Sequence, residues 1–159
     1  VDSKAPRKLA GGVYNQRVAE CAEIERLAGS NDWFAMTPDL PAPLDARLRH
    51  IQSEQARVIE TCEAAEQGDL MRWGALMNES HRSLSRDYEV AGDAMDRLQA
   101  ALSGSPGCYG ARMTGGGFGG CVIALIEREK VPAVQQHVAE AYGDTQWIPC
   151  TPSVGARIL

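Results

Sequence analysis

Residues 111–126 read ARMTGGGFGGCVIALI, with five glycines among the seven residues from Thr114 to Gly120. Glycine adopts positive φ angles without a Cβ clash and lets other groups approach the backbone closely. A turn dense in glycine also lets successive N–H groups point into one concavity, which is how many proteins hold phosphate. The sequence therefore leaves two interpretations of this loop, a tight structural turn or one wall of an anion-binding site.

The loop also matches the dinucleotide-binding pattern G-x-G-x-x-G at Gly115, Gly117 and Gly120. That pattern requires a strand before the loop and a helix after it. Here Cys121–Ile126 follows, and its β-branched and apolar residues predict a strand. Glu140 lies at about the distance of a ribose-binding carboxylate, but within a helical pattern. The sequence thus disfavours a nicotinamide or flavin site, and it contains no Walker-type G-x-x-x-x-G-K-[ST] motif.

Composition and charge narrow the class of protein. The chain has 159 residues, of which 44% are hydrophobic and 23% charged, as in an ordinary globular domain. No apolar run approaches the roughly 20 residues of a membrane span, and we expect no membrane partner. A net charge of −5 with only small basic clusters disfavours nucleic acid. Five scattered cysteines without a C-x-x-C pair disfavour a disulfide framework and structural zinc, and favour a reducing cytoplasm.

Hydrophobic periodicity predicts five helices and few strands. The predicted helices are Gly12–Ala28, Leu44–Ala65, Leu70–Arg86, Asp93–Leu102 and Glu129–Tyr142. The predicted strands are Cys108–Met113, Cys121–Ile126, Thr145–Cys150 and one near Lys8–Leu9 or earlier. The first two helices are expected to bury Val18, Cys21, Ile24 and Leu27, and Leu44, Leu48, Ile51, Val58 and Cys62. This order predicts an α+β, ferredoxin-like fold, with a small mixed or antiparallel sheet and helices packed on one face.

No motif by itself identifies a general base, a nucleophile or a metal site. His50 and His137 are expected to face solvent among charged residues of their helices. His81 is too close in sequence to Glu79 and Ser80 to share one helix face with them, so no Ser-His-carboxylate triad is predicted. Tyr14 is expected just inside a helix start, either as a tyrosine at the edge of the core or as a polar group presented to a ligand.

Four segments, in this order, resemble the C-terminal half of the galactokinases, within the GHMP small-molecule kinase superfamily. They are Tyr14–Cys21, Met77–Leu84, Arg86–Val90 and Gly110–Cys121. The resemblance extends from about Ser3 to Pro152. Residues 90–94 read VAGDA, where the family usually reads V-S-x-P-E, so the substrate is expected to be galactose or a related sugar.

The resemblance implies a ferredoxin-like C-terminal domain, residues 1–159, of an ATP-dependent sugar 1-kinase. It implies that Tyr14 contacts the sugar in a cleft between two halves of the enzyme. It also implies that the glycine loop borders this site and packs against a phosphate-binding loop. The glycines of this loop are Gly115, Gly116, Gly117, Gly119 and Gly120. The family's catalytic base, phosphate loop and Mg²⁺ ligands belong to an N-terminal half whose motifs are absent from this chain. We therefore expect no catalytic or metal-binding residue here, and ATP and Mg²⁺ only in the complete enzyme.

Two other functions remain open at this point. One is a sugar and ATP sensor that is built on the same scaffold and acts through partner contacts instead of catalysis. The other is an independent ferredoxin-like binding module, which would be a stable monomer without an exposed apolar face.

Overall fold

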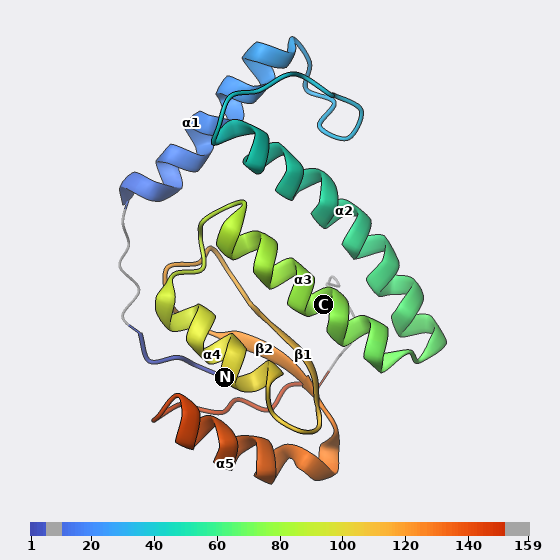
Figure 1. Ribbon diagram of the computed structural model, residues 1–159, viewed down its shortest axis with the longest axis vertical. Coiled ribbons are helices and arrows are strands. Elements are labelled where there is room, and N and C mark those ends of the chain that lie inside the picture. The colour runs from blue at the N-terminus through green and yellow to red at the C-terminus, as the bar shows by residue number, and fades with distance from the viewer. Residues whose placement is uncertain (6–10, 152–159) are drawn as a thin grey trace, which may run out of the picture.

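A computed structural model describes residues 1–5 and 11–151 and shows an α+β fold (Figure 1). The helices are α1 Gly11–Ala28, α2 Leu44–Gln67, α3 Leu70–Arg86, α4 Asp93–Ser103 and α5 Val131–Ala141, the last preceded by a 3₁₀ turn at Arg128–Lys130. The strands are β1 Cys108–Met113 and β2 Val122–Ile126. The predicted helices and the predicted hairpin are confirmed, with small differences at their ends.

The reversal between α2 and α3 shows how local sequence sets these ends. Gly68 adopts a left-handed conformation with φ 69°, which closes the last turn of α2. The Asp69 carboxylate accepts the N–H of Arg72 at 2.9 Å and caps the start of α3. These two residues place the end of α2 at Gln67 and the start of α3 at Leu70, close to the predicted boundaries at Ala65 and Leu70.

The sheet has the strand order of a ferredoxin-like fold. β1 and β2 pair in antiparallel fashion, with Met113 opposite Val122. The start of the chain extends the hairpin, because Asp2 forms antiparallel bridges to both Cys121 and Gln146. The order across the sheet is thus β1, β2, the N-terminal segment and the segment at Gln146, as in a β-α-β-β-α-β unit.

Two of the predicted strands need correction or fall outside the description. Thr145–Cys150 contributes only the bridge at Gln146. Pro149 has no N–H to donate, which limits ladder formation in this segment. The strand predicted near Lys8–Leu9 lies outside the described residues, and the alternative of an earlier start is represented only by the two bridges of Asp2.

The main core lies between the sheet and helices α4 and α5 (Figure 1). Leu98, Leu102, Val134 and Val138 are each 0% exposed, at the three- and four-residue spacings of helix faces. Full burial of such a side chain stabilises the fold by about 1.5–3 kcal/mol. The prediction of helices packed on one face of a small sheet is confirmed.

A smaller apolar cluster joins α1, the loop that follows it and the start of α2. Its buried members are Ile24, Met36, Leu40, Leu44 and Leu48. The prediction that Val18, Leu27, Val58 and Cys62 are buried is wrong. The first three side chains are each more than 40% exposed, and Cys62 is exposed as well. Only a narrow side of α1 meets the rest of the fold, and part of that side is occupied by buried charged groups, described below.

Helix α3 lies unusually close to β1 at two glycines. A Cβ atom on Gly74 would lie 2.1 Å from the carbonyl oxygen of Tyr109, and one on Gly110 would lie 1.9 Å from the carbonyl oxygen of Gly74. No side chain fits at either position, so the two backbones can approach each other. This close contact brings polar side chains of α3 within reach of the β1 backbone.

Candidate functional site

The glycine loop, residues 114–120, joins β1 to β2 through a series of left-handed conformations. Gly115, Gly117, Gly119 and Gly120 have φ values of 81°, 88°, 119° and 104°, and Phe118 has 59°. L-residues with a side chain seldom adopt such angles, which explains the density of glycine. Because β2 follows the loop directly, the structure confirms that the G-x-G-x-x-G match is not a dinucleotide-binding fold.

The middle of this loop packs on the backbone after α3. The Phe118 N–H donates to the carbonyl oxygen of Val90 at 2.9 Å. A Cβ atom on Gly117 would lie 2.1 Å from that same oxygen. At the tip, by contrast, Cβ atoms on Gly115 or Gly116 would meet nothing within 4 Å. The loop therefore has a fixed inner side and an open tip.

Tyr14 lies in the first turn of α1, as predicted, and is 68% exposed. Its helix is anchored one turn later by Arg17, which is 6% exposed. The Arg17 guanidinium donates through Nε to the carbonyl oxygen of Tyr88 at 2.6 Å, and through Nη1 to Glu20 at 2.8 Å. The Tyr14 ring thus stands on a helix end that is fixed to the segment following α3.

That segment, which we call the 87–90 turn, contacts both candidate elements. Arg17 of α1 binds its Tyr88 carbonyl, and its Val90 carbonyl accepts the Phe118 N–H of the glycine loop. Glu89 within the turn has a positive φ of 54°. The structure therefore attaches the helix that carries Tyr14 and the glycine loop to one short turn.

Arg47 of α2 completes this junction from within the fold. Its side chain is 2% exposed and donates to Glu20 at 2.8 Å and to Glu89 at 2.7 Å. It also donates to the carbonyl oxygen of Asp87. The hydrophobic pattern gave no indication of this buried cation, because its acidic partners Glu20 and Glu89 lie 27 and 42 residues away in sequence.

Glu20 remains ionised at this junction. Burial by itself would raise the pKa of its carboxyl, but the hydrogen bond and charge of Arg47, with the charge of Arg17, outweigh burial and lower it. The two arginines and two glutamates, Arg17, Arg47, Glu20 and Glu89, form a charge-compensated cluster. Hydrogen bonds from charged groups make this cluster directional, so it sets the angle at which α1 meets the turn.

His50 does not face solvent as predicted. It is 6% exposed, stacks on Tyr88 with ring centroids 4.6 Å apart, and its Nδ1 lies 2.9 Å from the Ser83 hydroxyl. That hydroxyl donates to Asp87 at 2.9 Å, so Nδ1 donates to Ser83. Burial lowers the pKa of His50. The prediction failed because Arg47, three residues earlier on the same helix face, is itself buried and paired with Glu20 and Glu89. His137, on α5, is half-buried.

His81 is also buried, at 4% exposure, and pairs with a residue that sequence reasoning missed. Its Nε2 lies 3.0 Å from the Asp96 carboxylate of α4, whose other oxygen accepts the Ser85 hydroxyl at 2.8 Å. Proximity in sequence pointed only to Glu79 and Ser80. A partner on a separate helix leaves no local spacing signal, so the pair emerged only from the fold.

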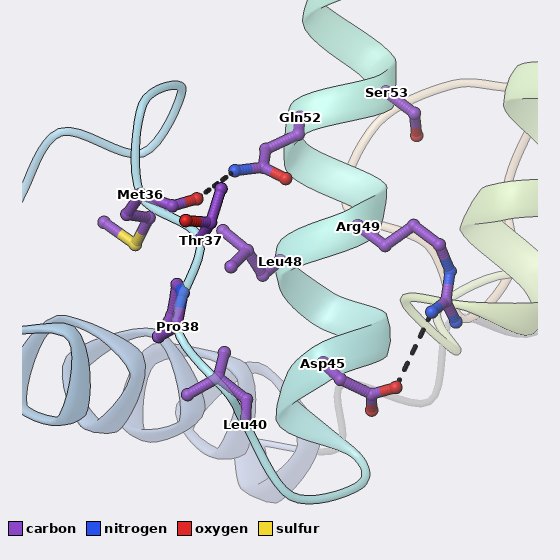
Figure 2. Close-up of a pocket in the computed structure, with 9 residues that line it drawn as sticks. All are labelled: Met36, Thr37, Pro38, Leu40, Asp45, Leu48, Arg49, Gln52 and Ser53. Atoms are coloured by element: carbon purple, nitrogen blue, oxygen red, sulfur yellow. Dashed lines mark hydrogen bonds and ion pairs between the residues drawn. The ribbon is translucent and has the colours of Figure 1, made fainter.

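A hollow of about 550 Å³ lies between α2 and the loop before it (Figure 2). Its polar groups serve the loop, since Gln52 donates to the carbonyl oxygens of Trp33 and Met36, both at 2.9 Å. Asp45 and Arg49 on its rim pair with each other at 3.6 Å. Neither Tyr14 nor the glycine loop lines this hollow, and we assign no ligand to it.

Within residues 1–5 and 11–151, no group of three His, Cys, Asp or Glu side chains is placed to hold a metal ion. No helix in these same ranges is long and apolar enough to cross a bilayer. All five cysteines are free thiols.

A family model described as GHMP kinases C terminal matches residues 61–144, more than half of the chain. The chain belongs to this family. The matched region contains the 87–90 turn and the glycine loop, whereas Tyr14 precedes it. The family match confirms the resemblance stated from the four sequence segments.

Two GHMP kinases show how much of a longer protein this chain resembles. A galactokinase of Roseiflexus sp. (strain RS-1) is 40% identical over 158 residues, which cover 90% of this chain and 40% of the relative. The crystal structure of Lactococcus lactis galactokinase complexed with galactose matches with a TM-score of 0.83 and 33% identity, covering 89% of this chain and 40% of that one. The chain thus spans about 40% of the length of each.

Proposed function

We propose that this chain is the C-terminal part of a galactokinase, which transfers the γ-phosphoryl group of ATP to the anomeric hydroxyl of galactose. The reaction forms galactose 1-phosphate and ADP and releases the hydroxyl proton. The observation that carries the proposal is the junction at the 87–90 turn, which holds the exposed Tyr14 helix end and the open glycine loop together. The two relatives support the substrate, since both are named galactokinases and one is described with galactose.

In this proposal the chain supplies one wall of a site between two halves. The Tyr14 hydroxyl hydrogen-bonds the sugar, and the 68% exposure of this residue leaves it free to do so. The inner side of the glycine loop is fixed by Val90, so Gly115 and Gly116 present a backbone surface without side chains. Such a surface lets a phosphate-binding loop of the other half approach closely.

Phosphoryl transfer also needs positioned phosphates, Mg²⁺ and a group that orients the nucleophile. The described residues offer no cluster that fits a divalent cation, so we assign Mg²⁺ no ligand in this chain and derive no step through it. We expect the catalytic base, the phosphate loop and the metal ligands in the N-terminal half. The purified 159-residue chain should then show no turnover of galactose and ATP. Measurable turnover would contradict this division of labour.

Exposed apolar residues on α1 support contact with the other half. Val18 lies one turn after Tyr14 on the same helix face and is 53% exposed.

The free thiols of the chain fit a reducing compartment, and we place the enzyme in the cytoplasm.

A matched pair of tyrosine variants tests the proposal in the full-length protein. In Tyr14→Phe, we expect the KM for galactose to rise about tenfold, because one hydrogen bond to the sugar is lost while the ring remains. The control is Tyr142→Phe, whose hydroxyl donates to the Ser3 carbonyl at 2.9 Å inside the fold. It should change stability without changing that KM. An unaltered KM in Tyr14→Phe would remove Tyr14 from the sugar site, and binding of galactose and ATP without turnover would favour the sensor function.

A further inference from the structure

The last residue of β1, Met113, leads directly into the glycine loop, and its backbone is held from outside the sheet. On one edge β1 pairs with β2. On the other edge, the Met113 N–H donates to Nδ1 of His81 at 3.1 Å, and the Ala111 N–H donates to Oδ1 of Asn78 at 3.0 Å. Asn78 and His81 are three residues apart and so lie on one face of α3. This face satisfies backbone donors that an edge strand would otherwise leave unpaired.

The contact with Met113 fixes the protonation state of His81. Because Nδ1 accepts a hydrogen bond, it carries no proton, and the single ring proton lies on Nε2, which donates to Asp96 at 3.0 Å. Asp96 is itself held by the Ser85 hydroxyl at 2.8 Å. A second proton on Nδ1 would set one N–H against another and break the bond to the strand.

We propose that His81 is a positioning residue whose neutral Nε2–H form, oriented by Asp96, fixes the end of β1 and thereby sets the conformation of the glycine loop for phosphoryl transfer. The inference rests on the proposed kinase function. The loop has its other fixed points at Val90, through Phe118, and at Ser3, whose N–H donates to the Gly120 carbonyl at 2.9 Å. Without the His81 bond, the stem at Met113 is held only on the side of β2, through the pairing with Val122 and the Thr114 N–H bond to the Cys121 carbonyl, and can shift away from α3.

The charges around His81 determine the pH range in which it acts. Burial lowers the pKa of His81, while the charge and hydrogen bond of Asp96 from α4 oppose this change. Arg112 of β1 lowers the pKa further, although it is paired with Glu54 of α2 at 2.8 Å. Two more arginines of α3, Arg82 and Arg86, line the same hollow of about 440 Å³ as His81. Burial is the largest of these effects and outweighs Asp96, so the pKa of His81 is lowered and the neutral form prevails at neutral pH.

Hydrogen exchange in the full-length protein tests the contact directly. In His81→Leu, the Met113 amide should exchange about tenfold faster, because a buried N–H has lost its acceptor. In His81→Asn, the side-chain oxygen lies close to the position of Nδ1, so protection should be retained. Unchanged protection of Met113 in His81→Leu would overturn the proposal.

The pH profile of kcat for galactose phosphorylation tests the positioning role. We expect kcat to fall about tenfold in His81→Leu with little change in the KM for galactose. His81→Asn should restore most of kcat and remove the acid limb due to His81. Asp96→Asn should move that limb to lower pH, because the Asp96 charge raises the pKa of His81. His137→Asn is the matched control and should keep the wild-type profile.

Two results would refute the positioning role. One is a wild-type kcat in a folded His81→Leu protein, and the other is an acid limb in the pH profile of kcat that does not move in Asp96→Asn. Absence of galactose phosphorylation in the wild-type protein would instead refute the proposed function. The exchange of the Met113 amide would then still decide whether His81 holds the strand, so the two failures are distinguishable.

Discussion

Replacement of Gly117 by alanine tests whether the glycine loop has to keep its inner side against the 87–90 turn. The added Cβ would lie 2.1 Å from the Val90 carbonyl oxygen, at a φ of 88°. Left-handed backbone costs an L-residue about 1–2 kcal/mol. Keeping the loop against Val90 would carry this strain together with the overlap between the Cβ and the carbonyl oxygen, whereas moving it away costs the hydrogen bond from Phe118 to Val90, about 1 kcal/mol. Movement is the smaller cost, so the loop should leave Val90.

A shift of this kind should appear in catalysis, because a displacement of about 1 Å near a reacting group can cost about 100-fold in rate. We therefore expect kcat/KM of the full-length Gly117→Ala protein to fall about 100-fold in an assay of ADP release with galactose and ATP. The matched control is Gly68→Ala at the reversal between α2 and α3, where φ is 69° and the added Cβ would meet nothing within 4 Å. Its activity should stay within about twofold of wild type, as for an exposed substitution. Equal activity of the two variants would refute the role of the loop as a fixed wall.

Three further predictions concern stability. Arg47→Met should lower the free energy of unfolding in urea by about 3–5 kcal/mol, because buried carboxylates lose their partner. The control Arg26→Met removes an exposed ion pair and should leave the free energy of unfolding nearly unchanged. Equal losses of stability in the two variants would contradict the prediction. Gly74→Ala should cost about 3 kcal/mol, since its Cβ overlaps the β1 backbone, and an unaltered melting temperature would contradict the close contact. Burial lowers the pKa of His50 and His81 below the ordinary 6.5, so the unfolded chain binds more protons just below that pH. The melting temperature should therefore fall as the pH drops below about 6.5, and a constant value down to about pH 5.5 would refute this.

Most of the fold could be predicted because its elements carry local signals. Apolar residues at helical spacing marked α4 and α5, and Gly68 with Asp69 marked the reversal between α2 and α3. The sequence predicted a full strand at Thr145–Cys150 because this segment has residues that favour strands, but the segment pairs only at Gln146. Pairing depends on how the neighbouring segments meet, which local residue preferences do not contain.

The candidate site could be predicted only where a segment has an unusual local sequence. The glycine loop is such a segment, and Tyr14 drew notice as an aromatic residue near a helix start. The buried contacts of Arg47 and His50 were missed because their partners lie 27 to 42 residues away in sequence. Charged and polar residues on amphipathic helices suggest solvent exposure unless the partner that compensates them is known.

The four segments that resemble the galactokinases meet in one network, which gives each of them a physical task. The first presents Tyr14 and binds the turn through Arg17. The second holds the edge of β1 through His81. The third is the 87–90 turn itself, and the fourth is the glycine loop, joined to it through Val90. In the proposed enzyme, the second and third segments would then act as supports and need not touch substrate. It follows that substitutions in the supports should lower kcat through displacement of the loop, whereas Tyr14 should act on the KM for galactose. A complete steady-state analysis of His81 and Tyr14 variants separates these two effects.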